Sequence, residues 1–232
     1  MNHSLKTCLL FILIVLIGTV PLYVYAAAPS EVQKAAQSGL DRFRSTIPAQ
    51  EMARMGLVTA EEVKAAVLGT PWNEYVITPA SLQAYKSGMS ISSLLTGTDN
   101  WIYPILVNGQ ARTMMEVSLQ NGNWEAATFG GTFLPQKLQE VQGRMGTLLG
   151  QKGISSQSAV TLRFVRVYQA AGEFMAVLGG GTEYLLPLMP NPARLNMAAD
   201  TLLAANQVIP QLKEAVQNNI QQWNERVKKT TK

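Results

Sequence analysis

Two Asn-Gly pairs, Asn108-Gly109 and Asn121-Gly122, constrain the fold of this 232-residue chain more than any other feature. Asn-Gly is the preferred pair in two-residue hairpin turns, because both central residues of such a turn need a positive φ. Alternating polar and apolar residues flank both pairs. The sequence therefore predicts a three-stranded antiparallel meander over residues 101–129.

Two-residue turns also fix which residues face each other across the meander. Across the first turn the predicted pairs are Val107 with Gln110, Ile105 with Arg112 and Tyr103 with Met114. Across the second turn they are Leu119 with Trp124, Val117 with Ala126 and Met114 with Phe129. This register predicts one core face with Ile102, Val117 and Trp124, and a second face that is also apolar.

The second face is predicted to carry six candidate binding residues, the apolar Trp101, Tyr103, Ile105, Met114 and Phe129 and the charged Arg112, together with Glu116. A sheet with one solvated side should be polar there. Two interpretations follow. Either another element of the chain covers this face, or the face is an exposed apolar groove for a peptide, a glycan or an acyl chain.

Residues 1–26 have the layout of a secretory signal peptide. Lys6 lies in a short polar region, residues 9–20 are apolar, and small residues follow Pro21. We expect cleavage after Ala26 and export to the periplasm or the medium, with membrane contact only in passing through this segment. An uncleaved membrane anchor is the alternative.

Cleavage at that point removes the single cysteine, Cys8, and the single histidine, His3. The remaining chain then cannot form a Ser-His-Asp or Cys-His arrangement, or a zinc site with His or Cys ligands. We therefore predict no catalytic residues, no metal and no cofactor. The net charge of +4 is too small to indicate a nucleic-acid partner.

The rest of the chain predicts helices and a second group of strands. Helices are expected at 29–46, 59–69, 132–149 and 200–228, and strands at 160–169, 174–178 and 182–188. The expected fold class is α+β, with two three-stranded antiparallel meanders packed with N-terminal, middle and C-terminal helices. Residues 27–232 are expected to form a single domain, and two helix–meander halves, 27–149 and 159–232, are the alternative division.

The C-terminal helix carries an apolar stripe and a basic end. The stripe comprises Leu212, Val216, Ile220, Trp223 and Val227, and the basic end comprises Arg226, Lys228, Lys229 and Lys232. Cations are favourable at a helix C-terminus, which accounts for the basic end. Loose contact with anionic lipid or a cell-wall polymer is the alternative.

These observations favour an exported binding protein without catalytic activity. We expect a protein- or peptide-interaction module of the cell envelope, such as an inhibitor or accessory factor. The first alternative is a carrier of a small apolar ligand or lipid, held between the meander and the helices. A carboxylate-based enzyme is the third possibility.

Overall fold

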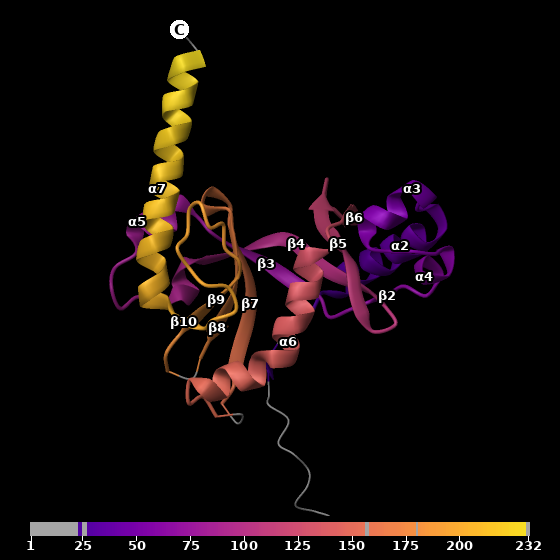
Figure 1. Cartoon of the computed structure of the whole chain (residues 1–232), viewed down its shortest axis with the longest axis horizontal. Coiled ribbons are helices and arrows are strands. Elements are labelled where there is room, and N and C mark those ends of the chain that lie inside the picture. Colours follow the sequence, from indigo (N-terminus) through magenta and orange to yellow (C-terminus); the bar gives the residue numbers. More distant parts are fainter. Residues whose placement is uncertain (1–22, 25–26, 156–157, 180, 231–232) are drawn as a thin grey trace, which may run out of the picture.

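The computed structural model describes residues 23–24, 27–155, 158–179 and 181–230 (Figure 1). It confirms the α+β class and the largely antiparallel sheet. The predicted signal peptide lies outside these ranges apart from β1 (Tyr23–Val24), whose backbone pairs in parallel with Val160 and Thr161. None of the helices in these ranges combines the length and the hydropathy that a bilayer span requires.

The elements follow the predicted order, with additions before the first meander. The N-terminal part contains α2 (Ser30–Thr46), α3 (Ala49–Met52), η1 (Ala53–Met55), α4 (Ala60–Lys64), β2 (Val67–Leu68), β3 (Trp72–Ile77), α5 (Pro79–Ala84) and η2 (Ile91–Leu94). The first meander and the middle helix are β4 (Leu95–Val107), β5 (Gln110–Gln120), β6 (Asn123–Gly130) and α6 (Phe133–Gln151). The second meander and the last helix are β7 (Val160–Val167), η3 (Tyr168–Ala170), β8 (Gly172–Leu178), β9 (Tyr184–Met189), β10 (Leu203–Ala204) and α7 (Ala205–Thr230).

The two meanders belong to one sheet, which β3 joins in the middle. The strand order is β10-β9-β8-β7-β3-β4-β5-β6. On one side β3 pairs antiparallel with β4, and on the other it pairs in parallel with β7, where Tyr75 lies opposite Val165. Both meanders were predicted from the sequence, but β3 and its parallel pairing were not.

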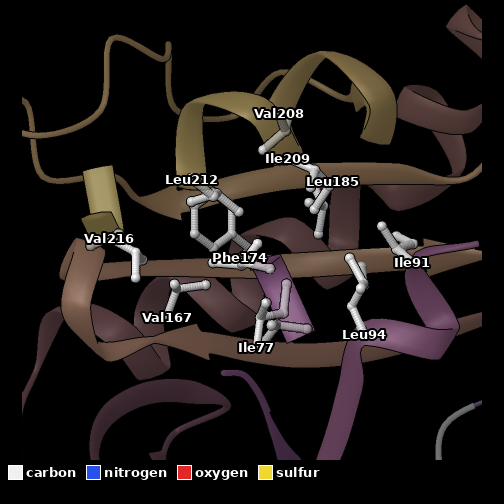
Figure 2. Packing of buried hydrophobic residues seen from close by; sticks show 14 of the residues in the cluster. Ile77, Ile91, Leu94, Val167, Phe174, Leu185, Val208, Ile209, Leu212 and Val216 are labelled. Carbon is white, nitrogen blue, oxygen red and sulfur yellow. The ribbon is translucent and has the colours of Figure 1, made fainter. Parts of the chain in front are cut away.

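Alternate residues of the central strands point to different cores. Phe164 of β7 lies in a cluster with Leu138 and Met145 of α6, so α6 covers one face of the sheet. Its neighbour Val165 lies in a cluster with Leu212 of α7 on the opposite face. Figure 2 shows this second cluster, in which α7 packs over the strands of the second meander.

The N-terminal helices cover the first meander on the face opposite α6. Val32, Leu40 and Phe43 of α2 are buried against Trp101 and Ile105 of β4. The first interpretation of the apolar second face therefore holds for these residues, because α2 lies over them. The chain itself supplies the cover that the alternation of the meander requires.

The turn prediction is confirmed, but the predicted register is wrong in part. Asn108, Gly109, Asn121 and Gly122 all have positive φ, as the turn type requires. A register shift between Ile105 and Leu106 then pairs Ile105 with Thr113 instead of Arg112.

The same shift changes the predicted pair that lies farthest from the first turn. Tyr103 pairs with Met115 instead of Met114. A second register shift, between Glu116 and Val117, pairs Phe129 with Met115 as well. Each shift inserts one residue and so moves the residues beyond it to the other face. The pairs next to the turns, such as Leu119 with Trp124, are as predicted.

Candidate functional site

The face of the sheet that α6 covers is apolar under the helix. Farther along the same strands, where α6 no longer covers it, this face is polar. In β7 Phe164 is followed on the same face by Arg166, and in β3 Trp72 is followed by Glu74. Because side chains alternate along a strand, residues two apart share a face. Five residues gather in this polar region, and we call them the Arg166 cluster: Glu74, Glu116, Arg166, Tyr168 and Glu173.

Glu74 lies at the centre of the Arg166 cluster and has no exposed surface. Its Oε1 accepts from Arg166 Nη1 and from the Tyr168 hydroxyl, both at 2.9 Å. Its Oε2 accepts from Asn100 Nδ2 at 2.8 Å and from Thr98 Oγ1 at 3.2 Å. A buried carboxylate is tolerated when donors replace its water. The Glu74 carboxylate has three donors of its own, and it shares a fourth, Thr98 Oγ1, with the Glu74 backbone carbonyl oxygen, which lies 3.0 Å from that hydroxyl.

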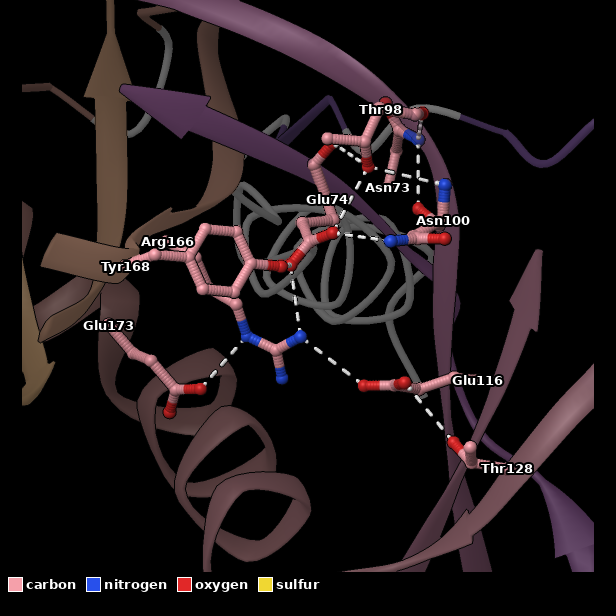
Figure 3. A network of polar contacts seen from close by, with 9 residues as sticks. All are labelled: Asn73, Glu74, Thr98, Asn100, Glu116, Thr128, Arg166, Tyr168 and Glu173. Carbon is pink, nitrogen blue, oxygen red and sulfur yellow. Dashed lines mark hydrogen bonds and ion pairs between the residues drawn. The ribbon is translucent and has the colours of Figure 1, made fainter. Parts of the chain in front are cut away.

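An irregularity in β4 supplies two of these donors. Between the pairs Asn73–Trp101 and Tyr75–Gly97, β4 contains two more residues than β3. The Asn73 side-chain amide donates to the carbonyl oxygens of Thr98 and Asn100, both at 3.2 Å. These bonds hold the bulged segment so that the Thr98 and Asn100 side chains reach Glu74 (Figure 3).

Arg166 joins three carboxylates that come from three different strands. Its Nη1 donates to Glu74 and, at 3.2 Å, to Glu116, and its Nε donates to Glu173 at 3.0 Å. Burial acts to lower the pKa of Arg166, but the negative charges of Glu173 and Glu74 outweigh it and raise that pKa. The remaining nitrogen, Nη2, carries no dashed line in Figure 3 and points away from Glu74.

The outer members of the Arg166 cluster are partly open to solvent. The second oxygen of Glu116 accepts from Thr128 Oγ1 at 3.1 Å. Tyr168 is 58% exposed although its hydroxyl reaches the buried Glu74. Desolvation and the hydrogen bond to Glu74 raise the pKa of Tyr168. The ring of Tyr168 therefore presents a surface to solvent while its hydroxyl is anchored.

An open hollow of about 450 Å³ adjoins the Arg166 cluster. It is bordered by Arg166, Tyr168, Ala171, Gly172, Glu173 and Met189. A register shift between β8 and β9 lies at Glu173, which pairs with Met189. Of the three carboxylates around the Arg166 guanidinium, Glu173 borders this hollow, and Glu74 and Glu116 are not among its lining residues. The cluster as a whole has three carboxylates and one guanidinium.

The structure brings four of the six predicted site residues together, but under α2. Trp101, Tyr103 and Ile105 are buried there, and Phe129 packs beside them with its ring 5.4 Å from that of Phe43. These residues form the interior between α2 and the meander.

The other two predicted residues lie elsewhere. The side chain of Met114 packs against the α6 cluster on the opposite face. Arg112 is the extra residue at the first register shift, and its Nη2 lies 3.7 Å from Glu62 of α4. The register shifts are the reason that Met114 and Arg112 are separated from the aromatic residues.

Tyr103 borders a second open hollow, of about 700 Å³, between the start of α2 and the meander. The hollow is also lined by Ala27, Ala28, Ser30, Gln33, Lys34, Gln37, Leu68 and Pro71. Tyr103 is 3% exposed, and its hydroxyl has no hydrogen-bond partner among the described residues. Burial raises the pKa of Tyr103 to about 12. A buried hydroxyl without a partner is uncommon in native structures.

The Arg166 cluster was not predicted from the sequence, although a signal for it was present. Arg166 lies in the apolar strand segment 160–167, and Glu74 lies in the apolar segment 72–77. Charged residues are almost never fully buried unless they are paired. Two opposite charges, each inside an apolar segment, were therefore an indication that the two segments pair.

No family model, no curated protein and no solved structure matches this chain. The assignment of a function therefore rests on the geometry of the described residues.

Proposed function

We propose that this protein is an exported, non-catalytic binding protein that receives a cationic side chain of a peptide or partner protein in the hollow beside the Arg166 cluster. The observation that carries the proposal is a cluster of three carboxylates and one guanidinium whose member Glu173 borders a hollow of about 450 Å³. A positive charge that enters this hollow is attracted by the carboxylates of the Arg166 cluster. Because these carboxylates are partly buried, the attraction is stronger than it would be between charges in water.

The walls of the hollow suit a side chain that has an apolar stem and a charged end. Met189 and the exposed ring of Tyr168 offer apolar surface for the stem. The Tyr168 ring can also attract the cation over its face. Glu173 uses Oε1 for Arg166, which leaves Oε2 as an acceptor for a lysine or arginine end.

Nη2 of Arg166, for which no hydrogen bond to another described residue is found, does not favour an anionic ligand. An anion there would lie close to Glu173 and Glu116 as well as to Arg166. The surrounding carboxylates already offset the charge of the guanidinium, so repulsion from them opposes anion binding. The charge balance therefore favours a cation.

The buried part of the cluster supports binding by fixing the residues that meet the ligand. Glu74 accepts from both Arg166 and Tyr168, and its other donors hold it in place. A site whose side chains are already ordered loses less entropy when the ligand binds. We assign Glu74 this positioning role.

Export is part of the same proposal and rests on residues 1–26 alone. Their polar start, apolar run and small residues before Ala27 support a signal peptide. Mass spectrometry of the protein recovered from its host tests this directly. A mature N-terminus at Ala27 is expected, and an intact N-terminus on protein retained in the cytoplasm would contradict export.

Binding is tested by NMR titration with short peptides that contain one lysine or arginine. Matched peptides in which norleucine or citrulline replaces the charged residue serve as ligand controls. We expect the Glu173→Gln variant to weaken binding of the charged peptides roughly tenfold, because a charge-assisted contact is lost. Glu125→Gln makes the same charge change at an exposed site of β6 and should leave the affinity unchanged.

Tyr168→Ala offers a second variant that leaves the charges in place. It should also weaken the charged peptides, since it removes the exposed ring. Equal binding of charged and neutral peptides, or equal losses in Glu173→Gln and Glu125→Gln, would contradict the proposal.

A carrier of a small apolar ligand is the second candidate, and the hollow at Tyr103 favours it. This hollow lies between α2 and the meander, and the buried hydroxyl of Tyr103 beside it has no hydrogen-bond partner within the described part of the chain. Lys34 lies at its border. An apolar molecule with an acidic head, such as a fatty acid, could receive both a hydrogen bond and a positive charge there.

Displacement of a fluorescent fatty-acid analogue tests the carrier. Tyr103→Phe removes the donor with little change of shape and should weaken binding, whereas Lys64→Gln on α4 should not. If the analogue does not bind, or if it binds the Tyr103→Phe variant as tightly as the wild type, the carrier function is excluded.

A further inference from the structure

The C-terminal helix α7 has a buried part and an exposed part on one apolar stripe. Leu212 and Val216 are buried against the second meander. The stripe continues through Ile220 to Trp223, and Trp223 is 65% exposed. Val227, one turn further, is also exposed. An exposed tryptophan that continues a stripe buried elsewhere makes this end of the helix a candidate contact surface.

The exposed part of α7 extends away from the rest of the fold. Every residue from Gln221 to Thr230 is exposed. Figure 1 shows the helix continuing well beyond the sheet and the other helices. At a rise of about 1.5 Å per residue these ten positions span about 15 Å. The end of the helix can therefore reach a flat surface without interference from the sheet.

The charges of this part are mainly positive. Residues 221–230 contain three cations, Arg226, Lys228 and Lys229, and one carboxylate, that of Glu225. The other polar residues in this range are neutral. Cations at a helix C-terminus are favourable in themselves. That effect accounts for the cations, but it does not account for an exposed tryptophan among them.

We propose that the projecting end of α7 docks on an anionic lipid surface. Trp223 would lie at the boundary between headgroups and acyl chains, where tryptophan is enriched. Arg226, Lys228 and Lys229 would lie against the anionic headgroups. A tryptophan and cations together on one helix are typical of interfacial helices. This contact goes beyond the transient one expected from the signal peptide, and it is independent of the hollow beside Arg166.

A second copy of this chain fits the exposed stripe less well. Beyond Ile220 the stripe offers two large apolar side chains, Trp223 and Val227, within the described part of α7. A stable dimer usually buries at least about 1,200 Å² in total, which two side chains per partner do not supply. Two copies would also bring two positive helix ends together.

Trp223 fluorescence on lipid vesicles tests the proposal in the full chain. Residues 9–20 are apolar and can bind vesicles themselves, so the measurement must be local to α7. The Trp223 emission is obtained as the difference between the wild type and Trp223→Phe. With vesicles of phosphatidylglycerol and phosphatidylcholine we expect a blue shift and protection from acrylamide. Vesicles of phosphatidylcholine alone should produce neither.

Charge variants separate the electrostatic part of the contact. Lys228→Gln with Lys229→Gln should weaken the Trp223 response about fivefold for each lysine removed, and added salt should weaken it further. Lys64→Gln with Lys86→Gln makes the same charge change at exposed sites of the N-terminal part and should have no effect.

Three kinds of result would overturn the proposal. The first is an unchanged Trp223 emission on anionic vesicles. The second is an equal response on phosphatidylcholine alone, or equal losses in the two double-lysine variants. The third is a dimer in sedimentation experiments without lipid that Trp223→Ala abolishes, which would make a second copy the occupant of the stripe.

Discussion

Nη1 of Arg166 lies 2.9 Å from Oε1 of Glu74, and this ion pair joins the two strands that pair in parallel at the middle of the sheet. Glu74 comes from β3 and Arg166 from β7, so the pair lies where the two meanders meet. Glu74 has no exposed surface, so its negative charge is stabilised by the side chains that donate hydrogen bonds to it and not by water.

Replacing Arg166 by methionine should destabilise the protein strongly. The substitution keeps an apolar stem but leaves the buried carboxylate of Glu74 without its cation. Breaking a buried ion pair from one side costs about 3–5 kcal/mol. The free energy of unfolding in urea at pH 7 measures the loss.

Arg54→Met is the matched control, because Arg54 pairs with Glu51 on the surface at 3.3 Å. An exposed pair of this kind contributes about 0–1 kcal/mol. A loss below about 1 kcal/mol for Arg166→Met would show that Glu74 does not need its cation.

Tyr103 should make stability depend on pH in the alkaline range. Burial raises its pKa to about 12 in the folded chain, while the unfolded value is 10.0. The folded state therefore holds the phenol proton more tightly than the unfolded state does. This contribution is complete below about pH 10 and is lost as the pH rises through about 12.

Tyr103→Phe isolates this effect from the other groups that titrate at alkaline pH. Between pH 9.5 and pH 11.5 the wild type should lose more stability than the variant, by an amount on the order of 1–2 kcal/mol. Urea unfolding at the two pH values measures the difference. Parallel losses in both proteins would mean that Tyr103 is not responsible.

Local turn chemistry made the two hairpins predictable, because the conformation of Asn-Gly is determined by the pair itself. The helices were predictable from apolar periodicity, as in α2, where Val32, Ala36, Leu40 and Phe43 are all buried. Residues close to the turns also had the predicted partners, such as Val107 with Gln110. Each of these features depends on residues that are near in sequence.

The features that escaped prediction depend on residues that are far apart. The pairing of Glu74 with Phe164 joins segments about ninety positions apart, and the opposite charges in the two segments do not by themselves specify this register. The register shifts at Ile105 and Glu116 leave no local mark in the sequence. For this reason Met114 was assigned to the wrong face, and the Arg166 cluster was not predicted at all.

Gly39 of α2 should not tolerate alanine, because the helix lies directly on the meander there. A Cβ at this position would overlap the Cβ of Ala126 and lie 2.5 Å from the sulfur of Met115. Overpacking of this kind costs about 1–3 kcal/mol, which exceeds the gain of up to about 1 kcal/mol in helix propensity. Thermal unfolding should show a lower melting temperature for Gly39→Ala.

Gly143→Ala is the opposite case within another helix. A Cβ at Gly143 of α6 meets nothing within 4 Å. The propensity gain is then unopposed, and the melting temperature should rise. If both variants shifted the melting temperature in the same direction, close contact between α2 and β6 would not explain the glycine at position 39.

Ala171, in the turn between β7 and β8 beside the Arg166 hollow, should be stabilised by a change to glycine. Its φ of 50° lies in the left-handed region, which L-residues other than Asn and Asp rarely adopt. The side chain is exposed, so its removal gives up little burial. We expect Ala171→Gly to raise the free energy of unfolding by about 0.5–1 kcal/mol, since the relief of strain exceeds the added flexibility of the unfolded chain.

Ala53→Gly is the control, because Ala53 is exposed and has an ordinary φ of −61°. This variant should lower the free energy of unfolding by about as much as Ala171→Gly raises it. A loss of stability in Ala171→Gly equal to that in Ala53→Gly would show that the turn is not strained.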